Sequence, residues 1–196
     1  MTPAPAENNA MSTESAPGAA GTAVAGAEDA HRLLRAVIQG ERLTQDETGV
    51  VFAALGAGDL SEAETAALLA ALHSRGETAD EVAGAASAFR HAARPFPEVT
   101  FPLVDVVGTG GDGAGTINIS TGAGIVAASM GISVAKHGNR AVSSRTGAAD
   151  VIAALGLPLN LSPQEAVEIL ARDHFTFLFA QAYHPAMKHV APIRRA

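Results

Sequence analysis

Residues 103–121 constrain the fold of this chain more than any other stretch. A short apolar run at 103–107, mostly β-branched, leads into residues 108–115, where five of eight positions are glycine. Residues 118–121, Asn-Ile-Ser-Thr, then open a segment of small residues. This order predicts a strand, a glycine-rich turn and a helix N-terminus. Because such a turn and helix start both present free N–H groups, we expect an anion site for a phosphate or pyrophosphate group.

Composition excludes several classes of protein. The 196 residues carry a formal net charge of −7, which disfavours a general nucleic-acid or anionic-membrane binder. The absence of cysteine excludes disulfides and thiolate chemistry. No apolar run reaches the roughly 18–20 residues of a membrane span, and the N-terminus lacks the pattern of a secretory signal. We therefore expect a soluble cytoplasmic protein.

The first half of the chain predicts a disordered tail followed by a helical domain. Residues 1–27 are mostly small or polar and are expected to be disordered, whereas residues 28–95 are expected to form a small helical bundle for packing or dimerisation. Three capping boxes begin its later helices, and two glycines are expected to end them. These are Thr44 with Glu47, Ser61 with Glu64, Thr78 with Glu81, and the stops Gly56 and Gly76.

The second half alternates strands with helices, which predicts a parallel sheet with right-handed crossovers. The expected strands are 103–107, 132–136 and 175–179, and the expected helices are 118–130, 147–155, 163–172 and a last one from His184. Ser162 and Glu165 form a fourth capping box. Because three strands make a thin sheet and the last helix has no cap, we expect that the chain is cut short.

The glycine-rich turn fits a dinucleotide fingerprint only formally, through Gly108, Gly110 and Gly113. That fingerprint expects an acidic residue at the end of the second strand, where this chain has Lys136 and His137. A cation there suits a second phosphate group. Residues 136–147 are dense in donors, and since the carboxyl ends of adjacent parallel strands meet at one edge, we expect both loops to converge. The histidines lack metal-site spacing, and there is no Ser-centred nucleophile elbow.

Taken together, these motifs resemble those of the anthranilate phosphoribosyltransferases of tryptophan biosynthesis. The resemblance rests on residues 105–112, 118–121, 136–140, 143–144 and 184–188, and it covers about residues 30–196 in order. It implies an α/β protein: a small N-terminal α-helical domain, then an incomplete parallel α/β domain of the nucleoside phosphorylase/phosphoribosyltransferase type at 101–196. It also implies that a helix at 184–196 packs with the helical domain.

The resemblance implies transfer of a phosphoribosyl group from phosphoribosyl pyrophosphate (PRPP) to the amino group of anthranilate, with Mg²⁺ and release of pyrophosphate. Ser120 would ligate one magnesium ion. Anthranilate would contact Gly108, His137, Asn139 and Arg194, and family members are usually homodimers joined through the helical domain. The residues that would bind PRPP lie in the glycine-rich turn, at the following helix start and after the second strand: Gly108, Gly111, Asp112, Thr116, Asn118, Ile119, Ser120, Thr121, Lys136, His137, Gly138, Asn139, Arg140, Ala141, Val142, Ser143, Ser144 and Ala148.

One departure from the family pattern concerns the metal. The family carries a later Asp-Glu pair that ligates magnesium, and this sequence has none after Arg194, so we expect the chain alone to be inactive and marginally stable. Two alternatives stay open from the sequence. One is a pyrimidine nucleoside phosphorylase-like enzyme of the same architecture, and the other is a non-catalytic paralogue that binds nucleic acid.

Overall fold

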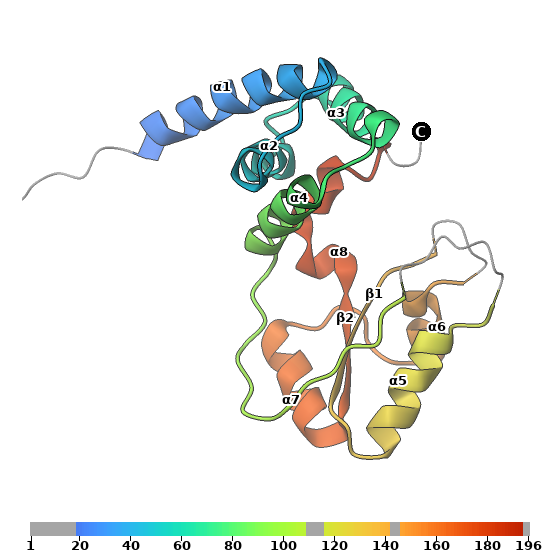
Figure 1. Ribbon diagram of the computed structural model, residues 1–196. Helices are drawn as coiled ribbons and strands as arrows, with labels where there is room; N and C mark the ends of the chain where they lie inside the picture. Colours follow the sequence, from blue (N-terminus) through green and yellow to red (C-terminus); the bar gives the residue numbers. More distant parts are fainter. Residues whose placement is uncertain (1–18, 109–115, 142–145, 194–196) are drawn as a thin grey trace, which may run out of the picture.

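The computed structural model describes residues 19–108, 116–141 and 146–193, and four helices occupy the first of these ranges. They are α1 (Ala19–Ile38), α2 (Gln45–Ala57), α3 (Glu62–Arg75) and α4 (Ala79–His91). Figure 1 shows these helices gathered at one end of the molecule, with the strands at the other end. α1 begins at Ala19, inside the segment 1–27 that the sequence predicts as a disordered tail.

The predicted capping boxes set the starts of these helices. Thr44, Ser61 and Thr78 each accept a hydrogen bond from the backbone N–H three residues later, and the glutamate there accepts one from the cap N–H. All three predictions are confirmed. The stop at Gly76 is also confirmed, but the stop at Gly56 is wrong. α2 continues to Ala57 and ends at Gly58, whose φ of 87° is the left-handed conformation that favours glycine.

The four helices enclose a core of their own. Thirteen buried apolar residues form one cluster, including Leu33, Val51, Leu55 and Leu68. α2 and α4 lie so close that a Cβ on Gly84 would be 2.3 Å from the carbonyl oxygen of Gln45. Close contact between these helices therefore requires glycine at this position.

The rest of the described chain forms the α/β region. Its elements are α5 (Ile119–Ser129), β1 (Val134–Gly138), α6 (Ala148–Ala154), α7 (Pro163–Asp173), β2 (Phe175–Phe179), α8 (Ala180–Tyr183) and the 3-10 helix η1 (Pro185–His189). β1 and β2 pair in parallel with Lys136 opposite Phe177, and α5 and α7 flank the strands (Figure 1). The capping box of Ser162 and Glu165 begins α7 as predicted.

Two predicted elements differ from the structure. Residues 103–107 do not form a buried strand: only Val104 bridges β1, and Val107 is 67% exposed. The Val104 N–H donates to the carbonyl oxygen of Ser133 at 3.0 Å, and the Ala135 N–H donates to that of Val104 at 3.0 Å. Among the described residues these two bonds form the one bridge between this segment and β1. The helix expected from His184 is a 3-10 helix that ends at His189, because Pro192 interrupts the run.

The end of the chain returns to the helices. Val190 is buried in the helical core, Met187 packs against that core, and Ala186 Cβ lies 3.1 Å from the position of a Cβ on Gly56. Within the described residues, no helix is long and apolar enough to cross a membrane.

Candidate functional site

A cavity of about 710 Å³ lies where β1 ends. Its walls come from four places: the irregular segment after Val104, the start of α5, the end of β1, and the start of α6 with Ala180. The described residues that line it are Val106, Val107, Gly108, Thr116, Ile117, Asn118, Ile119, Ser120, Ala123, Lys136, His137, Gly138, Asn139, Thr146, Gly147, Ala148 and Ala180. Segments that are distant in the sequence therefore meet at the carboxyl end of a parallel strand, where open α/β sheets bind ligands.

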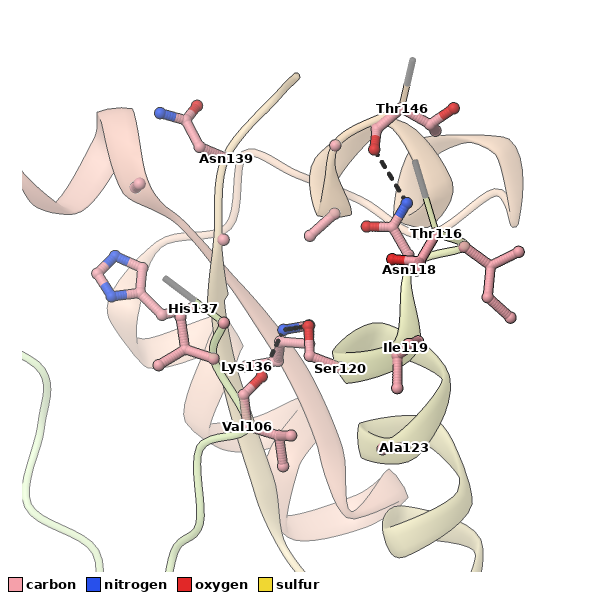
Figure 2. Close-up of a pocket in the computed structure, with 17 residues that line it drawn as sticks. Val106, Thr116, Asn118, Ile119, Ser120, Ala123, Lys136, His137, Asn139 and Thr146 are labelled. Carbon is pink, nitrogen blue, oxygen red and sulfur yellow. Dashed lines mark hydrogen bonds between the residues drawn. The ribbon is translucent and has the colours of Figure 1, made fainter. Parts of the chain in front are cut away.

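Lys136 carries the charge of this cavity. Its side chain is 1% exposed, and its Nζ donates to the carbonyl oxygen of Val106 at 2.7 Å and to Ser120 Oγ at 3.4 Å (Figure 2). Burial lowers the pKa of Lys136, while the nearby carboxylate of Asp105 opposes that shift. Among the described residues, no carboxylate contacts this ammonium group directly. A buried ammonium group in such surroundings is suited to an anionic ligand.

His137 points to the opposite side of β1 from Lys136, because successive strand residues alternate (Figure 2). Its backbone N–H donates to Asp105 Oδ1 at 3.2 Å, and its ring stacks on His184 with centroids 4.9 Å apart. Burial, helped by His184, lowers the pKa of His137, so the ring is mostly neutral at neutral pH. Its buried Nε2 atom has no hydrogen-bond partner among the described residues.

Two asparagine side chains that line the cavity are held in place by hydrogen bonds. Asn118 Nδ2 donates to the carbonyl oxygen of Thr146 at 3.0 Å, which joins the start of α5 to the approach to α6. Asn139 Oδ1 accepts from the N–H of Arg140 at 2.8 Å and from Gln181 Nε2 at 3.3 Å. None of the described lining residues is Asp or Glu, so the wall that the structure describes favours an anion over a cation.

The structure brings together ten of the predicted site residues: Gly108, Thr116, Asn118, Ile119, Ser120, Lys136, His137, Gly138, Asn139 and Ala148 line the same cavity. Three others do not line it. Thr121, on α5, is buried, Arg140 pairs with Asp150, and the Ala141 N–H donates to Asp150. Gly111, Asp112, Val142, Ser143, Ser144 and Arg194 lie outside the described residues.

Several residues of the site were not predicted. Val106, Val107, Ile117, Ala123, Thr146, Gly147 and Ala180 line the cavity, and Asp150 contacts its wall from behind. The spacing of Gly147 and Asp150, a carboxylate three residues after a helix start, was a usable signal for that contact.

A metal site is not formed by the described residues alone. They contain no group of three or more His, Cys, Asp or Glu that could hold an ion. The Ser120 hydroxyl is a suitable oxygen ligand for Mg²⁺, but the Lys136 ammonium lies 3.4 Å from it. A metal therefore fits here only together with an anion that offsets the lysine charge.

Comparison with known families agrees with this architecture. Residues 31–93 match a model described as the helical bundle domain of a glycosyl transferase family, and residues 100–196 match the a/b domain of the same family. The chain belongs to this glycosyl transferase family. The fold class predicted from the sequence, a helical domain followed by a parallel α/β domain, is confirmed.

Relatives within the family carry a consistent name. Anthranilate phosphoribosyltransferase from Idiomarina loihiensis is 52% identical over 84% of this chain and 49% of its own length. The enzyme of that name from Corynebacterium glutamicum strain R is 50% identical over 84% of this chain and 47% of its length. The resemblance predicted from the motifs is thus confirmed. The chain spans about half the length of the curated relatives it matches.

Solved structures of family members agree. Anthranilate phosphoribosyltransferase from Thermus thermophilus has a TM-score of 0.77 and 50% identity, covering 83% of this chain and 49% of that one. The Saccharomyces cerevisiae enzyme in complex with PRPP and Mg has a TM-score of 0.76 and 25% identity, covering 86% and 51%. Neither of the two alternative functions is favoured by these matches.

Proposed function

We propose that this chain provides the PRPP-binding part of an anthranilate phosphoribosyltransferase. In this reaction the amino nitrogen of anthranilate forms a bond to C1 of the ribose, the bond from C1 to the pyrophosphate oxygen breaks, and one amine proton is lost. Negative charge develops on the leaving group and positive charge on the sugar. A protein needs mainly to position the reactants and stabilise the leaving group, so no activated nucleophile is required.

The observation that carries the proposal is the buried Lys136 in a cavity whose described wall holds no carboxylate. The start of α5 and the Lys136 side chain line the same cavity, and the positive end of a helix dipole favours an anion (Figure 2). Diphosphate binding there would give the desolvated lysine its missing counter-charge. The remaining predicted PRPP contacts, Gly111, Asp112, Val142, Ser143 and Ser144, belong to this proposal through the resemblance.

Anthranilate would lie on the other side of β1, near His137 and Asn139. Figure 2 places these two side chains away from the side occupied by Lys136 and Ser120. This separation supports two adjoining subsites, one for the diphosphate and one for the amine. A neutral His137 would be able to accept the proton that the amine loses when it forms the bond to C1. Arg194 is the proposed partner of the anthranilate carboxylate.

Magnesium belongs to the proposal as a companion of the diphosphate. Ser120 would supply one oxygen ligand, with further ligands from the phosphates and water. When bound, Mg²⁺ neutralises charge on the departing pyrophosphate. The cytoplasm is the proposed location, since a substrate with this many charges does not cross membranes unaided.

Homodimerisation through the helical region is proposed as well. Ile38, Val50 and Val82 are exposed large apolar side chains on this region, at 54%, 39% and 57%. Light scattering coupled to size-exclusion chromatography tests it. A dimer of wild-type chain that dissociates in Val82→Glu is expected, and a monomer at all concentrations would contradict it.

Calorimetric titration of the chain with Mg·PRPP tests the proposed function. We expect saturable binding that Lys136→Met weakens by roughly one to two decades, the loss typical of removing one hydrogen bond to a charged group. Lys188→Met is the matched control, because Lys188 is exposed and does not line the cavity. A wild-type chain that does not bind Mg·PRPP would contradict the proposal.

A further inference from the structure

The carboxylate of Asp150, on α6, joins two stretches of backbone that are close in space. Asp150 Oδ2 accepts from the N–H of Ala141 at 3.2 Å and from the N–H of Gly147 at 2.9 Å. Asp150 Oδ1 accepts from Arg140 Nη1 at 2.9 Å. One side chain thus receives three hydrogen bonds, two from one stretch and one from the other. Bonds to a charged acceptor are the stronger kind.

The two stretches also touch directly. A Cβ on Gly147 would lie 2.3 Å from the backbone nitrogen of Ala141 and 2.6 Å from the carbonyl oxygen of Asn139. The Ala149 N–H donates to that same Asn139 oxygen at 3.1 Å. Since no side chain fits between them, the approach of residues 139–141 to the start of α6 is as close as backbone allows.

Both stretches form the cavity wall, although Asp150 does not. Gly138 and Asn139 line the cavity on one side of this contact, and Thr146, Gly147 and Ala148 line it on the other. We propose that Asp150 is a positioning residue, whose carboxylate holds these two parts of the wall in the arrangement that receives the diphosphate. This inference rests on the proposed function for the identity of the ligand.

Arg140 forms an ion pair with Asp150 and so takes part in this contact between the two stretches. Its guanidinium is bound to Asp150 and is not among the described groups lining the cavity. Arg140 therefore supports the wall through its contact with Asp150. Hydrogen bonds from Gly147 and Ala141, followed by the contact with Arg140, lower the pKa of Asp150, so the carboxylate stays ionised across the neutral range.

Asp150→Asn tests the inference because it keeps the size of the side chain and replaces one acceptor by a donor. Glu168→Gln is the matched control: it removes one negative charge from an exposed position on α7. Two quantities are measured for both variants. The first is amide hydrogen exchange of Ala141 and Gly147 by NMR without ligand, and the second is the dissociation constant for Mg·PRPP by calorimetry.

In Asp150→Asn we expect both amides to exchange about tenfold faster and Mg·PRPP to bind about tenfold more weakly, with unchanged far-ultraviolet circular dichroism. Glu168→Gln should alter neither quantity by more than about twofold. Unchanged amide exchange in Asp150→Asn would overturn the inference, and so would faster exchange with unchanged affinity. A wild-type chain that does not bind Mg·PRPP would contradict the proposed function instead, and the amide exchange would then still decide whether Asp150 holds the wall.

Discussion

The helical region and the α/β region bury their side chains to different extents. Thirteen buried residues form one core cluster in the helical region, Val190 included, whereas the α/β cluster has three. Among the described residues, the exposed large apolar side chains of the helical region are Ile38, Val50 and Val82, and all the others follow residue 102. The helical region therefore holds its fold through its own core, and the α/β region depends more on what it contacts.

Buried polar atoms without a hydrogen-bond partner among the described residues also differ in number between the two regions. Four of the five buried side-chain atoms without a partner among the described residues belong to the α/β region: Thr121 Oγ1, His137 Nε2, Thr176 Oγ1 and Tyr183 Oη. Such atoms cost stability unless a ligand or water satisfies them. The difference indicates that substitutions in the helices mainly change stability, and that substitutions around the cavity mainly change binding.

Glu81→Gln in the helical region should have the largest effect. The Glu81 side chain is 1% exposed, pairs with Arg75, and accepts from the N–H of Leu43 at 3.0 Å. Removing one partner of a buried pair costs about 3–5 kcal/mol of unfolding free energy. Urea unfolding followed by circular dichroism measures it. Glu41→Gln, at an exposed position, is the control, and a loss equal to the control's would contradict the assigned role of the pair.

Lys136→Met, in the α/β region, should lower the affinity for Mg·PRPP without lowering the free energy of unfolding. Replacing a buried, desolvated lysine by an apolar side chain of similar length should leave stability unchanged or raise it. Affinity for Mg·PRPP should instead fall by about 1.5–3 kcal/mol, the typical contribution of a hydrogen bond to a charged group. Thermal unfolding and calorimetry on the same sample measure both quantities. A strongly destabilised variant would show that Lys136 supports the fold of this region.

The sequence predicts the helical region better than the site, for local reasons. Capping boxes depend on residues three apart, and all four are present where the sequence places them. The contact of Glu81 with Leu43 spans 38 positions and has no sequence signal. Glu81 was therefore predicted as a cap residue but not as half of a buried ion pair.

The cavity shows the same limit of local reasoning. The sequence predicts that the loops after residues 103–107 and after β1 converge, because the carboxyl ends of neighbouring parallel segments meet at one edge of a sheet. Gly108, Lys136 and Asn139 do line one cavity. The composition of residues 103–107 predicts a buried strand, but this segment bridges β1 at Val104 alone, and Val104 and Val107 are exposed at 40% and 67%. The roles of the individual site residues remain predictions.

Lowering the pH should destabilise the helical region through Glu81. Hydrogen bonds from Arg75 are the main reason that the pKa of Glu81 is lowered from 4.5 to about 2. The stabilisation is therefore complete above about pH 4.5 and is lost as the pH falls toward 2, at up to about 1.4 kcal/mol per pH unit for one proton. Urea unfolding across this range should show the slope in wild-type protein and not in Glu81→Gln. Parallel curves would contradict this assignment.

Removing one helix N-cap from each region should give the smallest losses of stability. It also tests whether the two regions unfold as one cooperative unit. Ser61→Ala and Ser162→Ala each remove a hydroxyl that accepts from a backbone N–H, at 3.3 Å in α3 and 3.2 Å in α7. Each should cost about 1 kcal/mol, because a cap acts only on its own helix end. Thermal unfolding by circular dichroism measures both, with the exposed Ser74→Ala as the control. If Ser162→Ala costs nothing while Ser61→Ala costs the expected amount, α7 does not unfold together with the helical core. The two regions then differ in cooperativity as well as in burial, since a cap lowers global stability only where its helix belongs to the unit that unfolds.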